Sequence, residues 1–175
     1  MKYFLLDIAP ACTQAPRILS GNEELNRRDI NLKNHSAIKN RMLFFIDSTQ
    51  GTIFTGIVTQ PFFLLSEAMH KITKQYEPAM PSKQVVLLGK ENHISSLYYL
   101  PILPRIKAIS DKSTLNNGRT KFIGNPVLKK SWLNNRHMLW LADFNSDLPI
   151  ISLDLAESML RRGARGLALT PVILE

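Results

Sequence analysis

Two stretches of this sequence, PFFLLSEAMHKI at 61–72 and PIISLDLAESML at 149–160, follow one pattern. In each, a proline and large apolar residues lead to a residue that can cap a helix, Ser66 or Asp154, and then to an amphipathic run. A short apolar run bounded by proline is typical of a strand, and apolar residues three and four apart are typical of a helix. The pattern predicts a duplicated strand-to-helix unit, each followed by an apolar strand. A chance likeness between common residues is the alternative.

The first helix has local signals for its start and its end. Ser66 can accept hydrogen bonds from the free amides of the first turn. Met69, Ile72 and Tyr76 continue an apolar stripe. Pro78 disfavours helical backbone at the residue before it, so we expect the helix to end there.

The second helix has a comparable set of signals. Asp154 lies three residues before Glu157, which is the spacing of a capping box. Arg161 and Arg162 fall in the last turn, where the helix dipole favours cations. Gly163 can adopt the left-handed conformation that stops a helix.

Apolar and β-branched runs elsewhere predict strands, and turn residues predict how they connect. A buried first strand is expected at 3–8 rather than a secretory signal, because Asp7 interrupts the apolar run. We expect one hairpin around Gly51 and another around Asn134-Asn135. The expected strands and loops are as follows: a hairpin of 42–47 and 52–58; a buried strand at 85–88; an extended segment at 97–110 that Pro101 and Pro104 place at a sheet edge or a bend; a hairpin of 126–133 and a central strand at 137–143; a closing strand at 167–174 that Pro171 places at an edge or a bulge; irregular chain at 13–40 with one helical turn near 23–28; and a loop at 110–120 with a turn at Asn117-Gly118.

These elements predict an α+β fold with mixed or antiparallel sheets and a few short helices. Residues 1–60 would supply a strand, an irregular segment and a hairpin, and residues 61–175 the repeated α+β region. A chain of 175 residues fits one compact domain.

The lone cysteine, Cys12, excludes a disulfide within the chain and any site with several thiolate ligands. A reducing compartment suits such a chain. No run approaches the roughly 18 apolar residues of a membrane span, so we expect a cytoplasmic protein.

The net charge of +8 is concentrated in the middle of the chain, where residues 61–145 carry 12 basic and 5 acidic side chains. Such an excess favours an acidic partner, either nucleic acid or an acidic protein surface. A solvated surface that keeps the protein soluble is the alternative.

Lys129, Lys130 and Arg136 surround Trp132, which is how binders of single-stranded nucleic acid combine charge with base stacking. The alternative is a hairpin with solvated lysines and an inward-facing tryptophan.

A second basic cluster comprises Arg161, Arg162 and Arg165. These arginines can complement the helix dipole. If the protein binds another protein, both clusters are candidate contacts, since arginine and tryptophan are enriched among residues that anchor interfaces.

No pattern of catalytic or metal-ligating residues occurs. The four histidines lack partners at ligand spacing, and no phosphate-binding loop or nucleophile turn is present. We therefore predict no catalytic residue, no metal and no cofactor, with Cys12 acting as a small hydrophobic residue.

Over residues 55–175 the chain resembles a known family. The strings FFLLSEAMHKI, YYLPILPRIKAIS, HMLWLAD and PIISLDLAESMLRRGARGLALTPV occur in this order. They resemble family eleven of the immunity proteins that protect bacteria from polymorphic toxins. The matching positions are Leu65, Ser66, Glu67, Tyr98, Tyr99, Leu153, Leu160, Gly166, Thr170, Pro171 and Val172.

The resemblance implies a protein that binds and neutralises a co-encoded toxin without catalysis. The positive middle segment suits a toxin with an acidic contact face. A basic nucleic-acid-binding protein is the alternative, and an enzyme acting on a small molecule would need a deep polar pocket.

Overall fold

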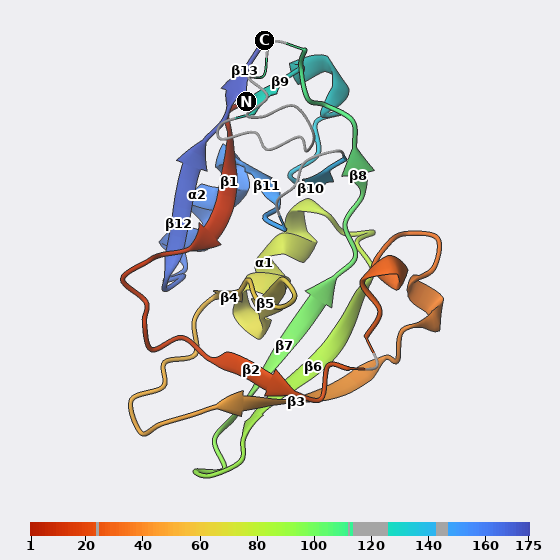
Figure 1. The fold of residues 1–175 in the computed structure, drawn as a ribbon. Coiled ribbons are helices and arrows are strands. Elements are labelled where there is room, and N and C mark those ends of the chain that lie inside the picture. The colour runs from red at the N-terminus through yellow and green to blue at the C-terminus, as the bar shows by residue number, and fades with distance from the viewer. Residues whose placement is uncertain (24, 112, 114–125, 143–146) are drawn as a thin grey trace.

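The protein is an α+β chain of mixed sheets and short helices, as its sequence predicts. The computed structural model describes residues 1–23, 25–111, 113, 126–142 and 147–175 (Figure 1). The described strands are β1 (Tyr3–Ile8), β2 (Arg17–Ser20), β3 (Arg41–Asp47), β4 (Ile57–Val58), β5 (Leu64–Ser66), β6 (Ser82–Gly89), β7 (Ser95–Pro101), β8 (Arg105–Ile106), β9 (Val127–Leu128), β10 (Met138–Leu141), β11 (Ile150–Ser152), β12 (Leu167–Pro171) and β13 (Ile173–Leu174). The described helices are α1 (Glu67–Tyr76), α2 (Leu153–Arg161) and the 3-10 helices Arg27–Asp29, His35–Ala37 and Lys130–Trp132.

Within the described residues, a five-stranded sheet has the order β12-β1-β11-β10-β8, and a six-stranded sheet has the order β2-β3-β6-β7-β5-β4. A small third sheet pairs β13 with β9. Most neighbours are antiparallel, but β10 with β8, β3 with β6 and β13 with β9 are parallel. Residues 1–60 contribute β1 to the five-stranded sheet and β2, β3 and β4 to the six-stranded sheet.

The strand-to-helix unit occurs twice, as β5 followed by α1 and β11 followed by α2. Ser66 caps α1 as predicted, because its side chain accepts from the amide of Met69 at 3.4 Å. The prediction that Asp154 caps α2 is wrong. The cap is Ser152, whose extended backbone lets its hydroxyl accept from the amide of Leu155 at 3.3 Å.

Both helices end where the sequence predicts. Glu77 is the C-cap of α1, immediately before Pro78. Gly163 follows α2 with a φ of 77°, a conformation that glycine adopts at no steric cost.

Buried side chains of the described residues gather in three clusters. The first joins the facing sides of α1 and α2 to both large sheets, the second covers one face of the six-stranded sheet, and the third joins the five-stranded sheet to the small sheet of β9 and β13. Representative members are Met69, Ile72, Leu155 and Met159 of the first cluster, Phe44, Val85, Leu87 and Tyr98 of the second, and Leu5, Leu128, Leu139 and Ile150 of the third. The helices therefore hold the two large sheets together.

Both predicted hairpins are wrong. β3 pairs with β2 and β6, and residues 57–58 pair instead with β5. β9 pairs in parallel with β13, while both edges of β10 are taken by β11 and β8. Asn134 and Asn135 do adopt positive φ, but they turn the chain from a 3-10 helix rather than from a paired strand. Turn residues reverse the chain locally, whereas the partner of a strand depends on distant segments.

The remaining strand predictions have mixed outcomes. β1 is a largely buried first strand, β10 is a central strand buried along its length, and β12 is an edge strand, all as predicted. Residues 13–40 are mostly irregular, with the helical turn at Arg27–Asp29, but β2 was not predicted. The predicted turn at Asn117-Gly118 lies outside the described residues.

The segment with Pro101 and Pro104 is an edge only at β8. β7 lies between β6 and β5, which is possible because its proline occupies the last position of the strand. β6 contains the predicted strand at 85–88, but its burial alternates, so the prediction that this run is wholly buried is wrong. No helix in the described ranges is long and apolar enough to cross a membrane.

Candidate functional site

The predicted cluster at 129–136 is only partly assembled. Lys129, Lys130 and Trp132 lie together at a short 3-10 helix after β9. The ammonium group of Lys129 lies 4.8 Å from the centre of the Trp132 ring and 3.6 Å from a carboxylate oxygen of Asp111. Trp132 is 48% exposed, so it does not pack inward, and it forms a small cationic and aromatic surface with the two lysines.

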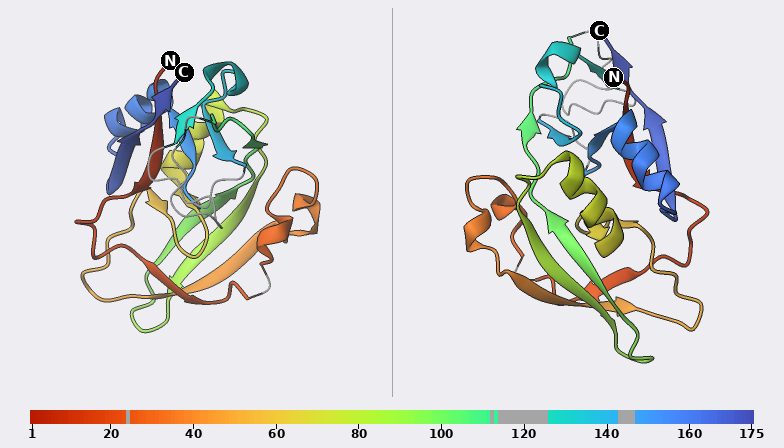
Figure 2. Two further views of the ribbon diagram at one scale, coloured as in Figure 1. Left: turned by 45° about the horizontal axis from the view of Figure 1, so that its top comes forward. Right: turned by 180° about the vertical axis from the view of Figure 1, so that it is seen from behind.

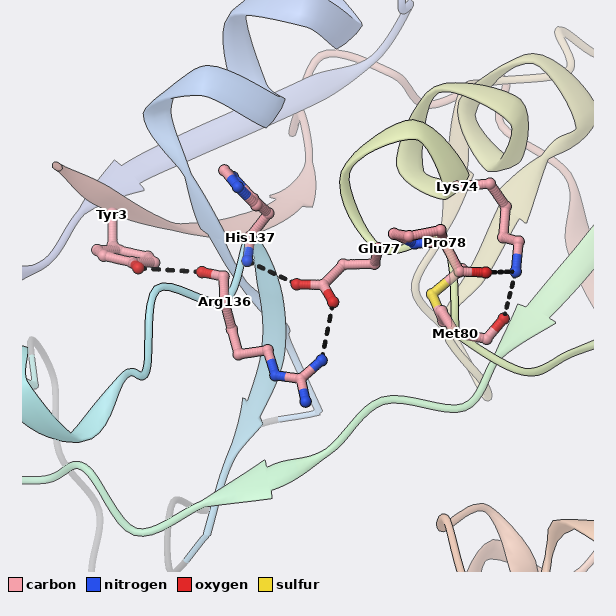
Figure 3. Close-up of polar contacts among 7 residues, drawn as sticks. All are labelled: Tyr3, Lys74, Glu77, Pro78, Met80, Arg136 and His137. Carbon is pink, nitrogen blue, oxygen red and sulfur yellow. Dashed lines mark hydrogen bonds and ion pairs between the residues drawn. The ribbon is translucent and has the colours of Figure 1, made fainter.

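Arg136 has a different environment from its neighbours in sequence. Its guanidinium donates to Glu77 at 3.0 Å, and its carbonyl accepts from the hydroxyl of Tyr3 at 3.0 Å (Figure 3). The other carboxylate oxygen of Glu77 accepts from the amide of His137 at 2.7 Å. Arg136 therefore helps join the end of α1 to β10 and β1.

Glu77 is the centre of this junction and is only 8% exposed. Its carboxylate is fully engaged by Arg136 and His137, which compensates the cost of burying the charge. Beside it, Lys74 donates to the carbonyls of Pro78 and Met80 and so satisfies the end of α1 (Figure 3). This arrangement stabilises the fold, and a cavity of about 200 Å³ next to it has a mainly apolar lining.

The second predicted cluster is dispersed along the end of α2. Arg161 pairs with Glu157 at 3.0 Å, one helical turn earlier, and Arg162 and Arg165 are exposed. These arginines precede β12, whereas the 129–132 surface adjoins β13 at the other end of the same C-terminal segment (Figure 1). The two basic clusters are therefore separate surfaces.

Two of the histidine side chains, His70 and His137, also have structural partners. His70 stacks on Tyr99 with ring centres 3.9 Å apart and hydrogen-bonds to Ser82 at 2.9 Å. Burial, followed by the charge of Lys74, lowers the pKa of His70 below its usual value. His137 hydrogen-bonds to Ser152, the residue that caps α2. Across the described ranges no group of three or more residues is arranged to hold a metal ion.

Tyr98 is buried in the second cluster, where its hydroxyl donates to the carbonyl of Thr55 at 2.6 Å. Burial raises the pKa of Tyr98 well above its usual value. The neutral phenol therefore serves as a fixed hydrogen-bond donor inside the core.

A surface that the sequence analysis did not identify lies on the six-stranded sheet. We define the sheet face by five side chains that share one side of β3, β6 and β7: Leu43, Phe45, Val86, Leu88 and Leu97. They alternate with buried neighbours, so they point away from the second cluster. α1 covers the part of this side near β5 and β7, and the strands extend beyond it (Figure 2).

Exposure confirms that the sheet face is open. Leu43 is 44% exposed and Val86 is 37% exposed, and the other three members are partly buried. A cavity of about 360 Å³ lies at the edge of β3, where Arg41 and Leu43 meet residues of the second-cluster side such as Leu25, Ile38 and Met42. In the sequence, the only sign of the sheet face was the run of apolar residues in β6. Such a run does not show whether one face or both faces of the strand are covered.

No protein-family model matches this chain, and no curated protein matches its sequence.

Proposed function

We propose that this protein binds and neutralises a bacterial toxin that is encoded beside it, as an immunity protein does. The observation that carries the proposal is the sheet face, an apolar surface on regular and well-packed strands. Exposed apolar side chains that cluster on one surface are characteristic of protein interaction sites, whereas single ones are not. The choice of a toxin as partner rests on the ordered sequence strings that resemble immunity-protein family eleven.

The polar interior suits a binding scaffold. Glu77 is held by Arg136 and His137, and the buried Lys83 donates to Asn40 at 2.8 Å. Both contacts link distant segments of the chain and so contribute to rigidity. A rigid surface loses little conformational entropy on binding, which favours affinity.

We propose a cytoplasmic location, where the single free thiol of Cys12 would stay reduced and a toxin could be met before export. The positive net charge would attract an acidic partner and speed its encounter.

The direct test uses the protein encoded by the gene immediately upstream. Cells that express that protein should stop growing, and co-expression of this chain should restore growth. The two purified proteins should also form a complex by size-exclusion chromatography. The proposal fails if the upstream product is toxic and this chain neither binds it nor restores growth.

Nucleic-acid binding is a second candidate because Lys129, Lys130 and Trp132 form a cationic surface with an exposed aromatic ring. A filter-binding assay with single-stranded DNA and RNA tests it. A nucleic-acid binder should show affinity that falls steeply with salt and that depends on Trp132.

A further inference from the structure

We propose that the toxin docks on the sheet face, and that the toxin surface has an apolar centre flanked by carboxylates. This inference rests on the proposed function and specifies both the contact surface and the chemistry of the partner.

The sheet face is a continuous surface because its members are paired across the strands. Leu43 of β3 is opposite Val86 of β6, which is opposite Leu97 of β7. Phe45 and Leu88 form the adjacent row. None of these five belongs to the three buried clusters described above, so their outward surfaces are available for a partner.

The dimensions suit the centre of a protein interface. Three strands span about 10 Å across the sheet, and the four residue steps from position 41 to position 45 span about 13 Å along it. α1 already packs on the same side of the sheet, so the pleated surface can accept a folded element in close contact.

Cations lie at both ends of the sheet face, and Asp47, the carboxylate on this side of β3, is opposite Arg17 of β2. At one end, Arg41 donates to the side chain of Gln84 at 2.7 Å. At the other end, the ammonium group of Lys90 lies 4.4 Å from the centre of the Phe45 ring. Neither cation has an ion-pair partner within the described residues, whereas Lys71 on the nearby α1 is neutralised by Glu67.

The charges at the two ends of the sheet face indicate which kind of partner binds there. Two copies of this chain placed face to face would bring Arg41 and Lys90 against like charges, which disfavours self-association. A partner with carboxylates at both ends of an apolar centre would pair with both cations. Phosphates of nucleic acid would meet the cations but would leave the apolar rows without contacts.

The test compares two leucines of similar exposure on different surfaces. Leu43→Glu alters the sheet face, and Leu160→Glu alters a leucine on α2 that is 49% exposed. Affinity for the upstream-encoded protein is measured by calorimetry or surface plasmon resonance. We expect Leu43→Glu to weaken binding by about tenfold or more. We expect Leu160→Glu to leave binding within about twofold of the wild type.

Val86→Thr is a second variant because it keeps the branched shape of the strand residue while removing apolar surface. It should weaken binding without changing the melting temperature, so that a loss of binding is not mistaken for a loss of fold. Lys90→Gln should slow association and reduce its dependence on salt, since exposed charges act mainly on encounter rates.

The possible results distinguish a failure of the docking inference from a failure of the proposed function. If Leu43→Glu and Val86→Thr bind as well as the wild type while Lys129→Glu and Lys130→Glu lose affinity, the docking inference is overturned and the proposed function stands. The docking inference is also overturned if sedimentation shows a homodimer that Leu43→Glu dissociates, or if Leu43→Glu abolishes nucleic-acid binding. If the wild type neither binds the upstream product nor protects against it, both proposals fail.

Discussion

Replacing Glu77 with glutamine should destabilise the protein strongly for so small a change. Glutamine keeps the shape of the side chain but exchanges one carboxylate oxygen for an amide that can only donate. In the wild type both oxygens accept, from Arg136 at 3.0 Å and from the amide of His137 at 2.7 Å. The variant therefore loses a charged acceptor and sets one donor against another in a buried position.

The magnitude follows from these two contacts. A buried hydrogen bond to a charged group contributes about 1.5–3 kcal/mol. The ion pair adds about 1 kcal/mol, because the exposed Arg136 side chain (48%) lets solvent screen the pair although the Glu77 side chain is only 10% exposed. We expect a loss of about 2–3 kcal/mol in the free energy of unfolding. For a chain of this length the melting temperature should fall by about 5–10 °C.

Thermal unfolding followed by circular dichroism, together with urea titration, measures the change. Arg136→Gln is the matched control, since it removes the ion pair but leaves the bond from His137 to Glu77. It should cost about 1–2 kcal/mol, less than Glu77→Gln, because the buried carboxylate keeps the bond from His137 and the glutamine amide can still donate to it. The argument is refuted if Glu77→Gln unfolds at the wild-type temperature, or if Arg136→Gln is equally destabilising. Arg136→Glu would place a second carboxylate beside Glu77, so charge reversals that probe binding should be confined to Lys129 and Lys130.

Three further predictions concern local contacts. Ser152→Ala should cost about 1–2 kcal/mol of stability, because it removes both the cap of α2 and the hydrogen bond to His137. Asp154→Ala should cost only about a few tenths of a kcal/mol. A larger loss for Asp154→Ala in urea titrations would contradict the assignment of the cap. Tyr98→Phe should destabilise the protein by about 1–2 kcal/mol, because the carbonyl of Thr55 loses its buried donor, and an unchanged melting temperature would show that this bond contributes nothing. The pKa of His70 is lowered in the folded state, so the unfolded state binds the proton first and stability should fall as the pH drops below about 6.5. His70→Gln should flatten that part of the stability profile, and an identical profile in the variant would assign the acid sensitivity to other groups.

Local chemistry predicted the repeated units well. The start of α1 at Ser66, its end before Pro78 and the stop of α2 at Gly163 depend on residues within one or two turns of the helix ends. The cap of α2 was missed because Ser152 and Asp154 both carry a suitable oxygen. Which of them caps depends on where the helix begins, and the pairing of Ser152 with Tyr3 of β1 holds Ser152 in the extended conformation.

The candidate surfaces show the same difference between features set by neighbouring residues and features set by distant segments. Lys129, Lys130 and Trp132 are neighbours in sequence and proved to be neighbours in space. Arg136 is close to them in sequence, yet its guanidinium binds Glu77, which is 59 positions away, so its role was not predictable from its neighbours.

The sequence was sufficient to establish the α+β class, the two strand-to-helix units and the excess of positive charge, because each depends on composition or on contacts within a few residues. Strand partners and the open sheet face depend on the whole fold. Val86 and Leu87 are equally apolar, and Leu87 is buried while Val86 is exposed because the second cluster covers one side of β6 and α1 stops short of the other. A hydrophobic pattern shows which side chains favour burial, but whether a face is covered depends on where distant segments pack.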